Sequence, residues 1–365
     1  MLQRAAALFL VCASMALCVS CGSTTSRFLY AALPTSDQIV AFREDPNSGI
    51  LTQLAVSPIT AGPSVQSLVI HPSSKFLYAA NAGEGDVSQF NISSSGALTE
   101  QIPRTPVGAA PTVLAMDPAG TYLYVANSGD KSVSVFSIDP TKGTLSSVAQ
   151  TSGPTVPLGI TPINMQVLPS GSSSAGFLYV TGAGQPGYIE VFSLSNGVLT
   201  PLSPTSFFFT GTNPYGLAIS PNGSYLYTAN NIDNSISEFT ISAGSLSQLA
   251  NSPIGQQSTT TTPVALLIDK TGKFLYVANQ GSPNLTAYSI DPTNGGISLL
   301  TTSPFTTGAQ PSALASDPAG KYLFVGNQKS PFTIQSFNLD TSSGALTLVN
   351  SYPVPQAAAS IATTF

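Results

Sequence analysis

The segment KFLYAANAGEGDVSQF, residues 75–90, decides the fold because it recurs along the chain. Close copies are TYLYVANSGDKSVSVF at 121–136, SYLYTANNIDNSISEF at 224–239 and KFLYVANQGSPNLTAY at 273–288. The aromatic–Leu–aromatic triplet within it begins at Phe28, Phe76, Tyr122, Phe177, Tyr225, Phe274 and Tyr322. Successive triplets are 46 to 55 residues apart, which indicates seven structural units of blade length.

Each unit contains four short apolar segments separated by residues that favour turns. Gly accepts positive φ, Asn and Asp side chains bond their own backbone, and Pro ends a strand ladder. A glycine follows the third segment of every unit, at Gly49, Gly96, Gly143, Gly197, Gly244, Gly295 and Gly344. No segment shows a sustained helical period. The pattern predicts an all-β, seven-bladed β-propeller with four-stranded blades over residues 28–365.

The two ends of the repeat region distinguish a closed ring from a linear β-solenoid. The first unit starts at RFLYAAL, residues 27–33, and lacks the apolar strand that precedes the triplet in the other units. The last residues, PVPQAAASIATTF at 353–365, contain such a strand with no triplet after it. We expect residues 355–365 to supply the innermost strand of the first blade and so to close the ring.

The composition narrows the classes of function. Only 7% of the 365 residues are charged and 42% are hydrophobic, a balance that argues against disorder and for a turn-rich β protein. The formal net charge is −5 and no basic run occurs, so a nucleic-acid partner is not expected.

The first twenty residues have the features of an export signal. Arg4 precedes the apolar run AAALFLVCASMALCV, which is too short to span a bilayer comfortably. The following CVSC resembles the lipobox of bacterial lipoproteins, which implies cleavage after residue 20 and a lipid on Cys21. The resulting division is a signal peptide at 1–20, a lipidated tether at 21–27 and the propeller at 28–365. An ordinary signal peptide that ends near Ser20 is the alternative.

Both alternatives export the chain to the cell envelope, and the lipoprotein alternative anchors it to a membrane. Cys12 and Cys18 would leave with the signal peptide. The mature chain would then keep Cys21 alone, so no internal disulfide is expected.

The repeats HPSSKFLYAANAGEGDVSQFNI and DPAGTYLYVANSGDKSVSVFSIDPTKGTLS resemble those of the seven-bladed lactonase propellers, which include propeller-type 6-phosphogluconolactonases. The similarity covers residues 28–365, and the YVAN phrasing is equally similar to YVTN-type propellers of surface proteins. The lactonase resemblance implies hydrolysis of a sugar lactone at one mouth of the central channel. No cofactor is expected.

The resemblance also implies His or Arg directly after the proline that leads into each innermost strand, where either could polarise a lactone carbonyl or hold a phosphate. Those positions here hold Ser64, Thr112, Ile163, Tyr215, Val264, Ser312 and Gln356. None is His or Arg, so the site is atypical and the catalytic residues are unknown. The lone histidine, His71, lies by this mapping on the opposite face, where we expect a structural or solvent-exposed role.

Five asparagines end the same strand in five units, and rotational symmetry would bring them into a partial ring: Asn81, Asn127, Asn230, Asn279 and Asn327. On the structural alternative, each amide bonds the backbone of its own loop. On the binding alternative, the five form a polar collar for sugar hydroxyls or, with nearby aspartates, for a hard cation. They are the candidate ligand-binding residues, and no metal site is assigned.

Two functions remain open because a fold does not determine function. One is an exported lactone hydrolase that acts on an unphosphorylated sugar lactone. The other is a non-catalytic propeller of the cell envelope that binds a protein or a glycan. A monomer is expected in either case.

Overall fold

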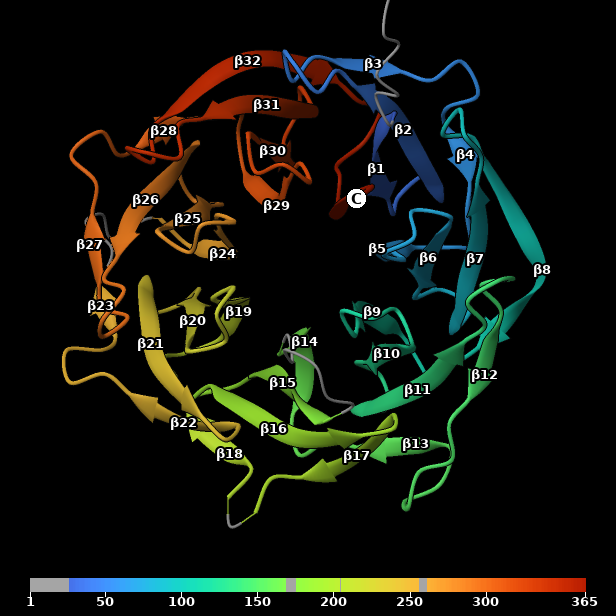
Figure 1. Ribbon diagram of the computed structural model, residues 1–365, viewed down its shortest axis with the longest axis horizontal. Helices are drawn as coiled ribbons and strands as arrows, with labels where there is room; N and C mark the ends of the chain where they lie inside the picture. The colour runs from blue at the N-terminus through green and yellow to red at the C-terminus, as the bar shows by residue number, and fades with distance from the viewer. Residues whose placement is uncertain (1–25, 169–174, 204, 256–260) are drawn as a thin grey trace, which may run out of the picture.

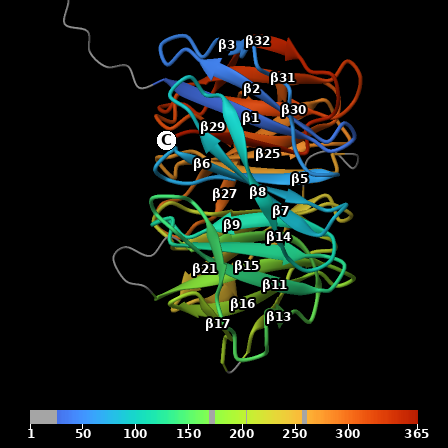
Figure 2. The same ribbon diagram turned by 90° about the vertical axis from the view of Figure 1, so that its right-hand side faces the viewer.

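The computed structural model describes residues 26–168, 175–203, 205–255 and 261–365. Seven antiparallel sheets surround a central axis, and the side view shows a shallow disc with loops on two faces (Figures 1 and 2). The seven-bladed all-β propeller predicted from the sequence is confirmed. No helix in these ranges is long and apolar enough to cross a membrane. The predicted signal peptide at 1–20 and Cys21 lie outside the described residues.

Blades one to three show the strand order, which runs from the channel outward. Blade one contains β33 (Ser360–Thr363), β1 (Arg27–Leu33), β2 (Gln38–Glu44), β3 (Leu51–Gln53) and β4 (Ile59–Thr60). Blade two contains β5 (Val65–Ile70), β6 (Phe76–Asn81), β7 (Asp86–Ile92) and β8 (Leu98–Pro106). Blade three contains β9 (Pro111–Met116), β10 (Tyr122–Asn127), β11 (Ser132–Ile138), β12 (Leu145–Ser147) and β13 (Thr155–Pro157).

Blades four to seven repeat this order. Blade four contains β14 (Thr161–Val167), β15 (Ala175–Ala183), β16 (Tyr188–Ser195), β17 (Val198–Pro201) and β18 (Phe207–Phe209). Blade five contains β19 (Pro214–Ile219), β20 (Tyr225–Asn230), β21 (Ser235–Ser242), β22 (Ser245–Gln248) and β23 (Ile254–Gly255). Blade six contains β24 (Pro263–Ile268), β25 (Phe274–Asn279), β26 (Asn284–Ile290), β27 (Ile297–Leu299) and β28 (Phe305–Thr306). Blade seven contains β29 (Pro311–Ser316), β30 (Tyr322–Asn327), β31 (Thr333–Leu339) and β32 (Leu346–Pro353).

The C-terminal strand closes the ring, as the unpaired ends of the repeat region predict. β33 pairs antiparallel with β1, with Leu29 opposite Thr363 and Ala31 opposite Ile361. Thr364 Oγ1 extends the pairing by accepting the backbone N–H of Phe28 at 2.9 Å. The first blade is therefore built from both ends of the chain, and β1 is paired on both sides, like the second strand of every other blade.

Neighbouring blades pack through the glycine that follows the third strand of each unit. All seven glycines have positive φ and lie against the first aromatic residue of the preceding blade. A Cβ on Gly96 would come within 2.3 Å of the Phe28 ring, and one on Gly49 within 2.4 Å of the Tyr322 ring. The second pair joins blade one to blade seven, so the same contact continues round the closed ring.

Buried tyrosines in the second strands reinforce this packing. Their hydroxyls donate to the carbonyl oxygen of the glycine in the next blade at 2.6 to 3.0 Å. The pairs are Tyr30 with Gly96, Tyr78 with Gly143, Tyr179 with Gly244, Tyr227 with Gly295, and Tyr276 with Gly344. Each hydroxyl satisfies a buried carbonyl between two blades, which is the requirement for placing a tyrosine in a core.

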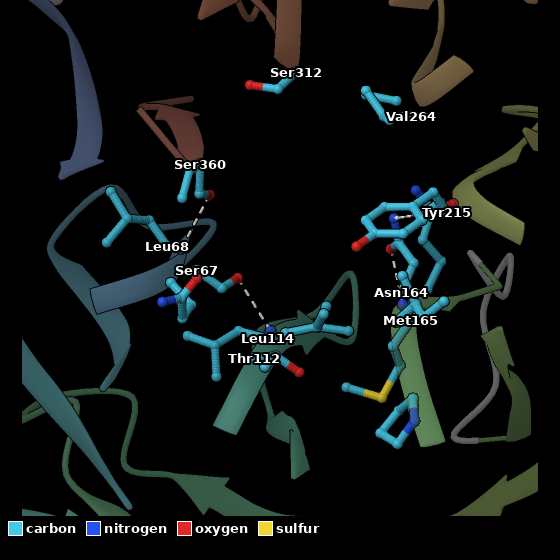
Figure 3. Close-up of a pocket in the computed structure, with 18 of the residues that line it drawn as sticks. Ser67, Leu68, Thr112, Leu114, Asn164, Met165, Tyr215, Val264, Ser312 and Ser360 are labelled. Atoms are coloured by element: carbon cyan, nitrogen blue, oxygen red, sulfur yellow. Dashed lines mark hydrogen bonds between the residues drawn. The ribbon is translucent and has the colours of Figure 1, made fainter. Parts of the chain in front are cut away.

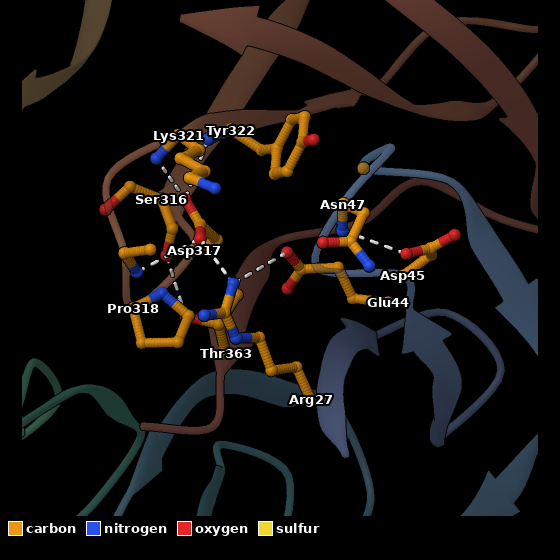
Figure 4. Close-up of polar contacts among 12 residues, drawn as sticks. Arg27, Glu44, Asp45, Asn47, Ser316, Asp317, Pro318, Lys321, Tyr322 and Thr363 are labelled. Carbon is orange, nitrogen blue, oxygen red and sulfur yellow. Dashed lines mark hydrogen bonds and ion pairs between the residues drawn. The ribbon is translucent and has the colours of Figure 1, made fainter. Parts of the chain in front are cut away.

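A small charged cluster, which we call the closure seam, joins blades seven and one on the face where β1 begins and β29 ends (Figure 4). Arg27 Nη1 lies 2.9 Å from Asp317 Oδ2 and 3.7 Å from Glu44 Oε1, and both acidic side chains are excluded from solvent. Asp317 also accepts the backbone N–H groups of Lys321 and Tyr322, whereas Glu44 has no hydrogen-bond partner among the described residues. Burial and the Asp317 charge raise the pKa of Glu44 to about 7, against the opposing effect of Arg27.

Candidate functional site

The five predicted asparagines each end the second strand of a blade, and all five side chains are completely buried. Each Nδ2 donates to two side-chain oxygens on the following strand, which for Asn127 are Ser132 Oγ at 3.1 Å and Ser134 Oγ at 3.0 Å. The loop that joins the blades packs a glycine on this amide, because a Cβ on Gly108 would lie 2.6 Å from Asn127 Nδ2. The same pair of donated bonds holds Asn81, Asn230, Asn279 and Asn327.

These contacts correspond to a structural role for the asparagines, with the amides bonded to the following strand rather than to the loop backbone that the structural alternative named. None of the five is among the residues that line the central cavity. A binding role would require side chains that a ligand can reach, and here their exposure is zero. The binding role of the five asparagines therefore remains a prediction without support from their positions.

Blade four replaces the asparagine with Gly182 and reorganises the same corner. Ile160 covers this glycine, since a Cβ there would be 2.4 Å from Ile160 Cβ. Glu190 occupies the position on the third strand that holds Ser134 in blade three, and its Oε2 accepts the Gly159 backbone N–H at 2.9 Å. Burial raises the pKa of Glu190 to about 7, and the bond from Gly159 opposes the rise.

A cavity of about 940 Å³ lies at the centre of the ring, where the innermost strands of the blades meet (Figure 3). One residue near the start of each innermost strand lines it: Ala359, Gln66, Thr112, Ile163, Tyr215, Val264 and Ser312. Five of these positions, from blades three to seven, are those predicted from the proline-led loops. Figure 3 shows the Tyr215 ring projecting into the opening.

The predicted positions in blades one and two are wrong, because Ser64 and Gln356 do not line the cavity. In blade two, Val65 pairs with Asn81 as Pro111 pairs with Asn127 in blade three. Pro63 therefore precedes the strand instead of starting it, and the facing residue is Gln66. In blade one the pairing of Ser360 with Ala32 makes Ala359 the facing residue.

The cavity lining is electrically neutral. The described residues that line it include no Asp, Glu, Lys, Arg or His. Its polar groups are hydroxyls and amides, from Gln66, Ser67, Thr112, Asn164, Gln166, Asn213, Tyr215, Asn231, Gln280, Ser312, Gln328 and Ser360. Such a lining can donate and accept hydrogen bonds but cannot neutralise a charged ligand.

Several charged residues of the mouth face hold loops. Arg104 bonds Glu100 at 2.7 Å and Glu84 at 2.9 Å on the rim of blade two. Asp130 Oδ2 accepts the Ala109 backbone N–H. No group of three or more His, Cys, Asp and Glu side chains in the described ranges is placed to hold a metal ion.

The lone histidine has the structural role that the sequence favours. His71 is buried, and its Nδ1 accepts the backbone N–H of Ser73 at 3.1 Å. Its Nε2 lies 3.0 Å from the carbonyl oxygen of Gly120 in the next blade. Both ring nitrogens are therefore occupied by contacts outside the cavity.

Several polar groups of the lining tie adjacent blades together. Ser67 Oγ accepts the Leu114 backbone N–H at 3.1 Å, and Ser360 Oγ accepts that of Leu68 at the same distance. Asn164 Nδ2 donates to the Tyr215 carbonyl oxygen at 3.1 Å. In Figure 3 these bonds lie along the wall, whereas the Tyr215 ring points into the opening.

The run Phe207, Phe208 and Phe209 divides between core and surface. Phe208 packs into the core between blades four and five, whereas Phe207 and Phe209 are 40% and 62% exposed. The ring of Tyr188 lies 5.1 Å from that of Phe209 and 6.3 Å from that of Phe207. These three rings lie on β16 and β18, among the outer strands of blade four and away from the central cavity.

Sequence reasoning missed the residues that follow three of the asparagines. Asn231, Gln280 and Gln328 line the cavity, although they are not among the predicted site residues. A position-by-position comparison of the repeats could have found them, because the equivalent residues Ala82, Ser128 and Ala183 are small.

The fold and its channel define a seven-bladed propeller with one central site, and residues 24–159 and 172–362 match the family model described as Lactonase, 7-bladed beta-propeller. The chain belongs to this lactonase family.

Among curated proteins, the chain is 28% identical over 232 residues to the 6-phosphogluconolactonase of Erwinia tasmaniensis. That match covers 59% of this chain and 61% of the relative, less than two thirds of the relative's length.

Two solved structures are similar in fold. A candidate 6-phosphogluconolactonase of Bacteroides fragilis matches with a TM-score of 0.75 and 20% identity, over 94% of this chain and 99% of that one. The periplasmic gluconolactonase of Pseudomonas aeruginosa matches with a TM-score of 0.71 and 20% identity, over 93% and 99%.

Proposed function

We propose that this protein is an exported lactonase-family hydrolase that opens an unphosphorylated sugar lactone in its central channel. The observation that carries the proposal is the neutral lining of a cavity of about 940 Å³, built from hydroxyls, amides and one exposed tyrosine. A sugar lactone is uncharged and rich in hydroxyls, so it matches such a lining without an ion pair.

A phosphorylated substrate fits this channel poorly. Phosphate binding uses convergent Arg or Lys side chains or a nest of backbone N–H groups. The described lining contains no Arg or Lys, and the bases Arg104, Lys131 and Lys329 on the mouth face are outnumbered by acids. The name of the Pseudomonas aeruginosa relative, a gluconolactonase, refers to a substrate without phosphate.

Hydrolysis would rest on hydrogen bonding instead of a charged acid–base pair. Water adds to the lactone carbonyl carbon, the ring C–O bond breaks, and the product is the open hydroxy acid. A donor aimed at the carbonyl oxygen stabilises the negative charge that develops there, an effect of about 10²–10³ in rate in other enzymes. The hydroxyl and amide side chains of the described lining are the donors available for this step.

A second function is favoured by the same lining: a non-catalytic propeller of the cell envelope that binds a protein or a glycan. Ester hydrolysis ordinarily uses a general base, and none of the described lining residues is a His, Asp, Glu or Lys. This candidate predicts binding without turnover.

The experiment uses the purified chain from residue 22 onward with a panel of lactones, with and without a chelator. The lactonase proposal predicts hydrolysis of D-glucono-1,5-lactone above the spontaneous rate, unchanged by chelator and slower for the 6-phosphorylated lactone. Faster turnover of the phosphorylated lactone would contradict the unphosphorylated substrate. Saturable binding of a neutral sugar without any turnover would favour the second function.

Export and anchoring are proposed from the leader sequence. Cleavage of residues 1–20 would leave Cys21 as the lipidated N-terminus, six residues before β1 begins at Arg27. Cys21→Ser should move the protein from the detergent phase to the aqueous phase in a phase-partition assay. Unchanged partitioning would instead favour an ordinary cleaved signal peptide.

A further inference from the structure

The seven blades differ at one position on the channel rim, directly after the position that holds asparagine in five of them. Blades one to four have short side chains there, Pro34, Ala82, Ser128 and Ala183. Blades five to seven have the amides Asn231, Gln280 and Gln328, and these three line the cavity. The amides are therefore gathered on one side of the mouth.

The fold does not require these amide side chains. The backbone N–H of Asn231 donates to the Asn213 carbonyl at 3.0 Å, and the N–H of Gln328 donates to the Gln310 carbonyl at 2.9 Å. Ala82 and Ser128 make the equivalent backbone bonds in blades two and three, at 3.1 and 3.0 Å. A residue with a short side chain thus completes the same turn, so the repeat geometry leaves the amides unexplained.

The position of Tyr215 on the innermost strand also differs between the blades. Its counterparts in the other blades are smaller, including Thr112, Ile163, Val264 and Ser312. The Tyr215 side chain is 44% exposed, and its backbone carbonyl is held by Asn164 from blade four. An exposed aromatic ring on a fixed backbone, inside a polar cavity, is poorly explained by core packing.

We propose that Tyr215, Asn231, Gln280 and Gln328, which we call the amide arc, form the subsite that binds a neutral pyranose ring. Tyr215 stacks against the apolar C–H face of the sugar, and the amides bond its hydroxyls, since an amide can both donate and accept. Gln280 Nε2 already donates to Gln328 Oε1 at 3.1 Å, which orients that pair across blades six and seven. The inference rests on the proposed function and names the residues that select its substrate.

The chain's own repeats supply the test variants. Tyr215→Thr copies blade three at that position, and the combined change Asn231→Ala, Gln280→Ala and Gln328→Ala copies blades two and four. Ser128→Ala, on the opposite side of the rim, is the matched control. Binding of methyl β-D-glucopyranoside, which has no lactone to hydrolyse, is measured by saturation-transfer NMR and titration calorimetry, with melting temperature recorded for every variant.

We expect at least tenfold weaker binding for Tyr215→Thr and for the triple variant, unchanged binding for Ser128→Ala, and similar melting temperatures throughout. Wild-type affinity in both arc variants would overturn the amide arc, and so would absence of binding by the wild-type protein.

Lactone hydrolysis is measured on the same samples. If turnover persists while the arc variants bind normally, the arc is wrong and the hydrolase proposal stands. If the arc variants lose binding while no lactone is turned over, the arc stands and the hydrolase proposal fails.

Discussion

The closure seam holds Arg27, Glu44 and Asp317 against one another where β1 begins, whereas the channel mouth presents neutral amides and a tyrosine. The chain has few charges to place, since only 7% of its residues are charged. At the seam, charge joins the two ends of the repeat, and at the rim it holds loops. Charge therefore serves the architecture, and the described lining of the channel consists of groups without charge.

Removing the strand that completes blade one should have the largest effect on the seam side of this comparison. Deletion of residues 355–365 exposes the edge of β1 and removes Ala358 and Ile361 from the core that blades one and seven share. We expect loss of the cooperative unfolding transition and aggregation, measured by calorimetry and size-exclusion chromatography. Phe365→Ala is the control, because that side chain is 63% exposed and should leave stability unchanged. A truncated chain that melts like the full-length protein would show that the ring closes without this strand.

Removing the cation of the seam should have the next largest effect. Arg27→Met leaves Asp317 and Glu44 buried without a counter-charge, and breaking a buried pair in this way costs about 3–5 kcal/mol of unfolding free energy. Arg43→Met on the neighbouring exposed position of β2 is the matched control and should cost less than ~0.5 kcal/mol. Urea titration of both variants measures the difference. Equal stabilities would mean that the seam charges contribute nothing to closure.

The structural features that could be predicted from the sequence are those that recur in every blade. The blades and the ring closure were predictable because the same residue types recur at one spacing and because both ends are unpaired. The amide arc was not, since its residues occur where the repeats differ, as Tyr215 does against Thr112. Gln66 was missed because Pro63 resembles the prolines that start other innermost strands, and only the pairing of β5 with β6 reveals the shift.

A smaller expected effect is the pH dependence of the unfolding free energy. It comes from the buried carboxyl groups and not from the neutral channel mouth. Burial raises the pKa of Glu190 and of Glu44 to about 7, above the value of 4.5 for an unperturbed glutamate. A raised folded-state pKa gives stability that is complete below pH 4.5 and is lost as pH rises through 7. We expect each glutamate to lower the unfolding free energy by about 2 kcal/mol between pH 5 and pH 8.

Glu190→Gln tests this sign, because it removes one titrating carboxyl and keeps an oxygen that can accept the Gly159 N–H. Its stability, measured by urea unfolding at several pH values, should vary less between pH 5 and pH 8 than that of the wild-type protein. A variant with the wild-type slope would assign the pH dependence to other groups.

The smallest expected effect concerns neighbouring residues that the structure assigns to different roles. Asn230 is buried and bonds Ser235 and Ser237, whereas Asn231 lines the cavity. Asn230→Ala should cost about 1 kcal/mol of stability through its lost hydrogen bonds and leave sugar binding unchanged. Asn127→Ala in blade three should have the same effect. The double variant should lose the sum of the two stability costs, because the two sites are in separate blades.

Asn231→Ala should do the reverse, weakening sugar binding and leaving the melting temperature unchanged. Measuring both quantities on each variant therefore compares residue 230 with residue 231 directly. If Asn127→Ala with Asn230→Ala weakened binding more than it lowered stability, the asparagines would be the binding collar after all. The expected order follows from exposure: a ligand can reach only a side chain that the cavity exposes, whereas a buried hydrogen bond between two strands contributes to stability without meeting the ligand.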